Sequence, residues 1–199
     1  SELGWGSFNA HFRDVLKGQL HDRSIKGFLQ GDYRPNENIQ DIKSLILGST
    51  IGKYSRYIKS NHSLNYLEAH DDHTFSDYLK LSSQKSKEYS IIINEEEHLA
   101  LNENELKMHK LGALLLMTSQ GIPFMHQGQE WGNTKIIAGS ESPDVNIGKI
   151  DRNSYNKDNE TNWMDWNEVK INGKLIDYYK DLITIRKTYS EFRNTNIDN

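Results

Sequence analysis

The chain has 199 residues, which is long enough to bury a hydrophobic core. Hydrophobic residues make up 35% and charged residues 26%, a composition typical of a polar, soluble globular protein. The net charge is −4 and Lys and Arg are not clustered, which argues against nucleic acid and anionic membranes as partners. The absence of cysteine excludes disulfides, thiolate metal sites and cysteine nucleophiles, but it leaves the compartment open: cytoplasmic, secreted or periplasmic.

The sequence predicts neither a membrane span nor a signal peptide. The longest apolar run, 111–117, is far shorter than the roughly 20 residues that cross a bilayer. The N-terminal sequence SELGWGSF has no basic residue followed by an apolar stretch, as a signal peptide would. It also lacks an initiator Met, so we expect a chain that is processed or belongs to a longer protein.

The first predicted elements are a short strand over 5–9 and a helix over 10–18. Phe12 and Leu16 share one face of this helix, and Gly18 is placed to end it.

The middle of the chain contains one clear strand between less regular segments. Residues 27–46 are mixed and contain turn signals, and 48–60 give no firm prediction. Residues 63–67 (SLNYL) show the apolar alternation of a strand. The polar segment 82–104 is predicted to be a surface excursion, with a short strand at 91–93.

A second helix is predicted over 102–119. Asn102 and Glu105 have the spacing of a capping box at its start, and Gly121 follows its end. The helix is apolar nearly all round, which predicts burial on more than one side. A buried strand is predicted at 122–127.

After another long polar segment, 135–162, the chain closes with an amphipathic helix over 175–189. Its apolar face comprises Leu175, Tyr178, Leu182, Ile185 and Tyr189. Strands and helices therefore alternate, which predicts an α/β fold with a parallel sheet built from βαβ units.

The stretch most suggestive of function is 63–79 (SLNYLEAHDDHTFSDYL), where a strand delivers His70, Asp71, Asp72 and His73 just past its end. Parallel α/β folds and barrels present their chemistry at such strand ends. Three interpretations are open. In the first, the cluster is a polar loop whose Asp caps the next helix and whose His residues are solvated. In the second it binds a metal ion, and in the third it is a carbohydrate site in which a carboxylate stabilises a cationic sugar.

Four motifs resemble glycoside hydrolase family 13, the α-amylase superfamily, and most closely its pullulanase and debranching branch. NYLEAHDDHTFSDYL resembles the segment around the family's third catalytic carboxylate. GIPFMHQGQEWGNTK is similar to the eighth barrel strand and its loop, DRNSYNKDNETNWMDW to a substrate loop, and WGSFNAHFRDVLKG to the sixth strand and helix. The motifs follow the family's order and cover most of the chain.

The resemblance implies roles for individual residues. Asp71 corresponds to the transition-state stabiliser and His70 to the residue that contacts the sugar, while Asp72 stands where Asn is more usual. Arg13 and Asp14 are expected to brace their helix. Further substrate-binding candidates are Glu130, whose alternative role is to brace its own loop, and Asn153, Tyr155, Asn156 and Asp158. At most one of Trp131, Trp163 and Trp166 is expected to stack on a sugar, because packing is the commoner role of Trp.

The resemblance also implies that the chain is incomplete as a catalyst. A retaining glycosidase needs two carboxylates about 5 Å apart, and the family's nucleophile and acid/base would lie upstream of Ser1. The expected fold is therefore the C-terminal portion of a TIM (β/α)8 barrel, about strands 6–8. Residues 1–199 are expected to form one partial catalytic domain, without the N-terminal strands or a C-terminal β-sandwich. On its own it should be inactive and only marginally stable.

The predicted function is part of a retaining α-glucan hydrolase that cleaves α-1,6 branch linkages in pullulan, glycogen or starch. The alternatives are an α-1,4-acting hydrolase or transglycosylase of the same family, a non-catalytic glucan-binding relative, and a metal-dependent phosphohydrolase built on the His-Asp cluster. The expected partner is an α-glucan, and no cofactor is required. No recognisable calcium loop is present and no metal ligand is assigned.

Overall fold

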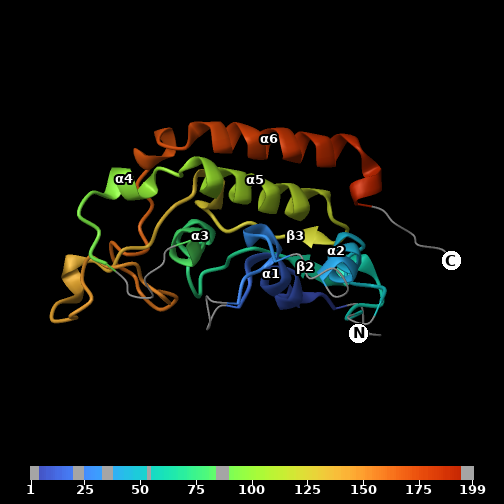
Figure 1. Ribbon diagram of the computed structural model, residues 1–199, viewed down its shortest axis with the longest axis horizontal. Coiled ribbons are helices and arrows are strands. Elements are labelled where there is room, and N and C mark those ends of the chain that lie inside the picture. Colours follow the sequence, from blue (N-terminus) through green and yellow to red (C-terminus); the bar gives the residue numbers. More distant parts are fainter. Residues whose placement is uncertain (1–4, 20–24, 33–37, 53–54, 84–89, 194–199) are drawn as a thin grey trace. The chain divides into compact units, whose positions relative to one another are not determined.

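The computed structural model describes residues 5–19, 25–32, 38–52, 55–83 and 90–193 (Figure 1). Its strands are β1 (Ser7–Asn9), β2 (Ser63–Asn65) and β3 (Ile122–Pro123). Its α-helices are α1 (Ala10–Lys17), α2 (Asn38–Ile46), α3 (Phe75–Ser83), α4 (Glu95–Leu99), α5 (Glu103–Thr118) and α6 (Gly173–Thr188). Short 3-10 helices cover Phe28–Gln30, Ser60–His62, Gln129–Trp131, Gly139–Glu141, Glu168–Lys170 and Ser190–Phe192.

The chain divides into two compact units. The first comprises Ser1–Leu67, Lys110–Met125 and Tyr178–Asn199. The second comprises Glu68–His109 and His126–Asp177. The first unit therefore contains all three strands, and the second contains the His-Asp cluster and the long polar segments.

The strands of the first unit form a parallel sheet in the order β1-β2-β3 (Figure 1). Phe8 pairs in register with Leu64, which in turn pairs with Ile122. The predicted mixed α/β organisation is confirmed, although β3 is much shorter than the 122–127 expected from sequence.

A row of buried amides holds this sheet together. Asn9 Nδ2 lies 2.9 Å from the hydroxyls of Ser49 and Ser63, and 3.2 Å from Asn65 Oδ1. Asn65 Nδ2 donates in turn to the carbonyl oxygen of Gln120 (2.7 Å) just before β3. These side chains are almost completely buried, and burial of amides is tolerated here because each is hydrogen-bonded.

Helix α1 begins and ends as its sequence predicts. The Asn9 side chain accepts a hydrogen bond from the backbone N–H of Phe12, which caps the helix start. Gly18 ends the helix with a φ of +95°, and a Cβ there would lie 2.3 Å from the carbonyl oxygen of Ile25. Only glycine fits both conditions. Within this helix, Arg13 donates to Asp14 and to the Tyr66 hydroxyl, contacts that agree with the bracing role expected for it.

The capping box of α5 is also confirmed. The Asn102 side chain accepts from the N–H of Glu105, and the Glu105 carboxylate accepts from the N–H of Asn102, both at 3.0 Å. The prediction that this helix is buried on more than one side holds only in part, because Leu114 is 37% exposed and Leu111 is half-buried.

The buried face of α6 differs from the predicted one. The buried positions are Leu175, Tyr179, Leu182 and Arg186. The predicted members Ile185 and Tyr189 are exposed, as is most of their side of the helix.

Arg186 explains this shift. Its guanidinium donates to the carbonyl oxygens of Met117, Ser119 and Gly121 at 2.7–2.8 Å. These carbonyls lie at the end of α5, where a helix leaves acceptors without backbone partners and where a cation is favoured. Arg186 is therefore buried on the face of α6 where an amphipathic pattern predicts only apolar residues.

The strand predicted at 91–93 is wrong. These residues form no strand, and the acidic sequence that follows them forms α4, capped by Asn94, whose side chain accepts from Glu97 N–H. The segment 27–46, whose sequence contains only mixed signals, includes α2. Of the three interpretations of the His-Asp cluster, one had an Asp capping the next helix; the structure has the Thr74 hydroxyl in that role, accepting from the N–H of Asp77. None of the helices in the described part of the chain is long and apolar enough to cross a membrane.

Replacing Arg186 with Met should lower the free energy of unfolding by about 2–4 kcal/mol, because three carbonyls lose their donors and each unsatisfied buried group costs roughly 1–3 kcal/mol before relaxation. Urea denaturation measures this effect. The neighbouring Lys187 is exposed, so Lys187→Met serves as the control and should shift stability by less than about 0.5 kcal/mol. Equal effects of the two substitutions would contradict the role given to Arg186.

Candidate active site

The loop that carries His70 and Asp71 lies in the second unit and is held by contacts of the Glu68 carboxylate. This carboxylate is 2% exposed, and one of its oxygens accepts from the N–H of Phe75, the first residue of α3. The other oxygen lies 3.1 Å from His126 Nδ1. Glu68 thus closes the loop on itself and fixes both of its ends, leaving His70 exposed and Asp71 half-buried between them.

Asp72 occupies a left-handed backbone conformation, with a φ of +57°. Asn and Asp are the non-glycine residues that adopt this conformation most readily. The position therefore favours Asp or Asn for a backbone reason, so Asp fits where the resemblance leads us to expect Asn. Its N–H donates to Asn153 Oδ1 at 3.1 Å, so the His-Asp loop contacts the predicted substrate loop.

Asp77 anchors the loop on the other side, from within α3. Its side chain is fully buried and accepts from the Thr134 hydroxyl (2.5 Å) and the Lys135 N–H (3.0 Å), with His98 Nε2 at 3.3 Å. Burial favours the neutral acid, but these hydrogen bonds outweigh burial and hold the pKa of Asp77 below its usual value.

Lys135 connects three segments of the site. Its Nζ donates to the backbone carbonyl of His70 (2.9 Å), its N–H binds Asp77, and its carbonyl accepts from the N–H of Asp151 (2.7 Å). Burial lowers the pKa of Lys135, and the nearby negative charges of Glu68, Asp77, Asp151 and Asp71 oppose that shift. The Lys135 side chain thus lies within electrostatic reach of Asp71, the candidate catalytic carboxylate.

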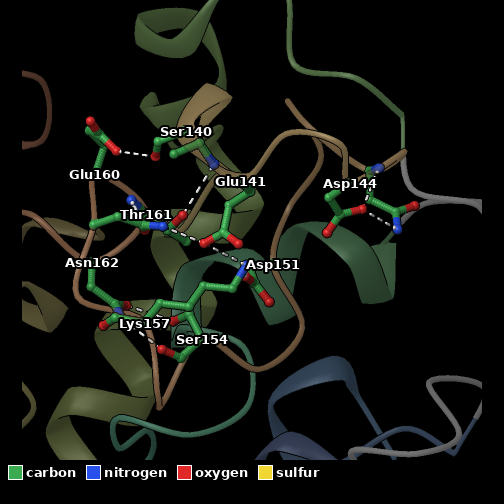
Figure 2. Close-up of polar contacts among 12 residues, drawn as sticks. Ser140, Glu141, Asp144, Asp151, Ser154, Lys157, Glu160, Thr161 and Asn162 are labelled. Carbon is green, nitrogen blue, oxygen red and sulfur yellow. Dashed lines mark hydrogen bonds and ion pairs between the residues drawn. The ribbon is translucent and has the colours of Figure 1, made fainter.

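The predicted substrate loop is held by its own polar contacts (Figure 2). Lys157 Nζ bridges Asp151 (2.7 Å) and Glu141 (3.3 Å). Burial disfavours its charge, but hydrogen bonds to the two carboxylates outweigh burial and raise the pKa of Lys157. Asn162 donates to the carbonyls of Ser154 and Lys157 at 2.7 and 2.8 Å. These contacts fix the loop internally and tie it to Glu141.

A pocket of about 210 Å³ opens beside His70. All of its lining residues belong to the second unit: His70, His126, Asn133, Thr134, Lys135, Tyr155, Thr161, Asn162, Trp163 and Met164. It combines aromatic walls with polar groups, as sites for small polar ligands do.

The structure brings only some of the predicted site residues to this pocket. His70 and Tyr155 line it, with their rings 6.2 Å apart in an edge-to-face arrangement. Asn153 contacts the His-Asp loop, and Asn156 and Asp158 are exposed.

Glu130 lies outside the pocket lining and has a local structural contact. Its carboxylate accepts from the N–H of Gly128 (3.1 Å). This contact is the loop-bracing role that sequence left as the alternative for Glu130.

Sequence reasoning missed Glu68, His126 and Lys135. Glu68 lies in the motif NYLEAHDDHTFSDYL and Lys135 ends the motif GIPFMHQGQEWGNTK, so their membership of these motifs was the available signal. Their partners, however, come from segments up to 65 residues away, which sequence spacing does not reveal. The described residues contain no group of three or more His, Asp or Glu side chains that could hold a metal ion.

Comparisons with known proteins agree with the motifs. No protein-family model matches the chain. The pullulanase of Bacillus subtilis (strain 168) is 29% identical over 192 residues, which are 96% of this chain and 23% of that protein. An isoamylase from Flavobacterium is 26% identical over 97% of this chain and 23% of its own length.

The solved structure of a mutant pullulanase from Paenibacillus barengoltzii, complexed with maltotetraose, is 30% identical with a TM-score of 0.72. The match covers 96% of this chain and 25% of that one, so the chain spans about a quarter of the length of the relatives it matches. The chain is therefore a relative of the pullulanases and debranching enzymes of glycoside hydrolase family 13.

Proposed function

We propose that this chain is the C-terminal portion of a (β/α)8 catalytic barrel, about strands 6–8, in a retaining hydrolase that cleaves α-1,6 branch linkages of pullulan, glycogen or starch. The observation that carries the proposal is the His70–Asp71 pair, which is presented on a braced loop beside a pocket with polar and aromatic walls. The similarity to pullulanases and an isoamylase supports the same conclusion.

The sheet supports its place in a larger barrel. Its three strands are parallel and follow chain order, as consecutive barrel strands do. Parallel sheets are normally covered on both faces. Here Phe8 of β1 is 50% exposed and Ile122 of β3 is 45% exposed. In a closed barrel, neighbouring strands and their helices would cover these apolar side chains and satisfy both strand edges.

In the proposed mechanism, Asp71 stabilises the oxocarbenium-like transition state with its negative charge, and His70 donates a hydrogen bond to a hydroxyl of the sugar being cleaved. We place the nucleophile and the general acid/base in the part of the whole protein that precedes residue 1. Lys135 holds the His70 carbonyl and so sets where Asp71 meets the substrate.

The proposed substrate is an α-glucan. One matching pullulanase has been solved with maltotetraose, an α-linked glucose oligomer. The debranching assignment, rather than α-1,4 hydrolysis, rests on the pullulanase-type loop around 151–166 and on the isoamylase similarity. Asn153, Tyr155, Asn156 and Asp158 of this loop are proposed to face the glucan, Asn153 through its link to the His-Asp loop.

Asp71→Asn tests this function directly in the whole protein that carries this chain. The variant should lose about 10²–10³-fold in kcat on pullulan, because it removes a charge that stabilises the transition state. Asp72→Asn is the matched control and should retain activity, since Asn suits its backbone conformation. Reducing-sugar release from pullulan and from linear amylose measures both variants.

Cleavage of amylose but not pullulan by the unmodified protein would keep the family and overturn the debranching assignment. Cleavage of neither would favour a glucan-binding relative without catalysis.

Lys135→Met should lower kcat by about tenfold or more while changing KM less, because misplacement of Asp71 affects the transition state more than substrate binding. Lys135→Arg keeps the charge and should retain more activity. Lys107, which is 69% exposed on α5, provides the control Lys107→Met. Steady-state kinetics on pullulan measure all three variants, and an unchanged kcat in folded Lys135→Met would contradict the positioning role.

A further inference from the structure

Helix α4 combines exposed acidic residues with one side chain, that of His98, which faces inward. Glu95, Glu96 and Glu97 are all exposed, whereas the side chain of His98 is 11% exposed. His98 Nε2 lies 3.3 Å from Oδ1 of the fully buried Asp77 in α3. A segment that is polar in sequence therefore supplies a partner to a buried carboxylate of the candidate site.

The direction of this hydrogen bond follows from the ionisation of Asp77. Burial disfavours the charged carboxylate, but hydrogen bonds, first of all the one from His98, outweigh burial and hold the pKa of Asp77 below its usual value. An ionised carboxylate only accepts hydrogen bonds, so Nε2 of His98 carries the hydrogen and donates it. Oδ1 also accepts from the Thr134 hydroxyl, and Oδ2 accepts from the N–H of Lys135. Without His98, this buried charge would lack one of its donors, which is unfavourable.

The backbone of His98 is anchored independently of its ring. Its carbonyl accepts from Nζ of Lys80, a buried residue one turn along α3 from Asp77 and on the same face of that helix. The next residue, Leu99, is buried, and its carbonyl accepts from Asn172 Nδ2 at 2.9 Å. The imidazole therefore approaches Asp77 from a fixed backbone, and little further conformational entropy is lost in making the contact.

Hydrogen bonds continue from Asp77 to the His-Asp pair. Asp77 accepts from the peptide N–H of Lys135, and Nζ of the same lysine donates to the carbonyl of His70 at 2.9 Å. His98 itself does not line the pocket. Any effect of His98 on the reaction must therefore pass through the placement of other residues.

We propose that His98 is a positioning residue: its Nε2–H holds the Asp77 carboxylate, and thereby Lys135, in the place from which Lys135 fixes the His70 carbonyl next to Asp71. This proposal rests on the proposed function. It gives a role to helix α4, which lies outside all four motifs that resemble the family. Packing alone would require only the volume of the imidazole, whereas positioning requires its N–H donor.

Amide hydrogen exchange at 134–135, measured by mass spectrometry on the whole protein that carries this chain, tests the structural part of the proposal. His98→Leu keeps the bulk but removes the donor, and it should speed exchange of the Lys135 amide by about threefold or more, because the acceptor of that amide is less fixed. His98→Gln restores an N–H donor and should recover most of the protection. Glu97→Gln, on the exposed neighbouring residue, is the matched control and should change nothing.

Steady-state kinetics on pullulan test the link to the reaction. His98→Leu should lower kcat by about threefold to tenfold, as expected for misplacement of a catalytic group, and His98→Gln should retain most of the activity. In a Lys135→Met background, His98→Leu should have little further effect, because substitutions that act through the same contact are not additive. Circular dichroism establishes that each variant is folded.

Unchanged exchange of the Lys135 amide in folded His98→Leu would overturn the proposal. Equal effects of His98→Leu and His98→Gln would also overturn it, since packing rather than the donor would then matter. So would an equal loss of kcat from His98→Leu with and without Lys135→Met. If exchange responds as expected but the unmodified protein hydrolyses no glucan, the positioning of Lys135 by His98 stands and the proposed catalytic function fails.

Discussion

The candidate site depends on one lysine. Through its ammonium group and its peptide group, Lys135 joins the His70 carbonyl, the Asp77 carboxylate and the Asp151 N–H. A buried ammonium is costly to remove from water unless partners compensate it, so this residue favours the one arrangement in which all its partners are in place. The His-Asp loop, helix α3 and the substrate loop are consequently fixed relative to one another within the second unit.

The first unit is also held by buried polar groups with several hydrogen-bond partners. Asn9 and Asn65 connect the strands through buried amides, and Arg186 satisfies the carbonyls at the end of α5. Burying these polar groups is unfavourable unless each finds its hydrogen-bond partners. The amides therefore favour one register of the strands, and Arg186 favours one packing of α6. Phe8 and Ile122, on the two outer strands of the sheet, remain half-exposed.

Sequence patterns predicted what depends on neighbouring residues. The capping box of Asn102 and Glu105, the end of α1 at Gly18 and the position of β2 were all correct, because their causes lie within a few residues. The His-Asp cluster was found through its motif. The buried face of α6 was not, because Arg186 is buried for the sake of distant carbonyls. Helix α4 was missed because its acidic sequence indicates only a solvated surface.

The site residues divide in the same way. Asp71 and His70 could be named from a contiguous motif, whereas the role of Lys135 arises from contacts that exist only in the folded chain. Glu130 shows the opposite case, since a motif position suggested ligand binding and the structure shows a hydrogen bond within its own loop.

We propose that these residues complete a catalytic barrel whose other two carboxylates lie elsewhere in the whole protein. The most direct measurement is reducing-sugar release from pullulan by the purified 199-residue chain, beside the whole protein. The whole protein should hydrolyse pullulan and the isolated chain should not, because retaining hydrolysis requires a nucleophile and an acid/base about 5 Å apart. Sustained hydrolysis by the isolated chain would contradict the claim.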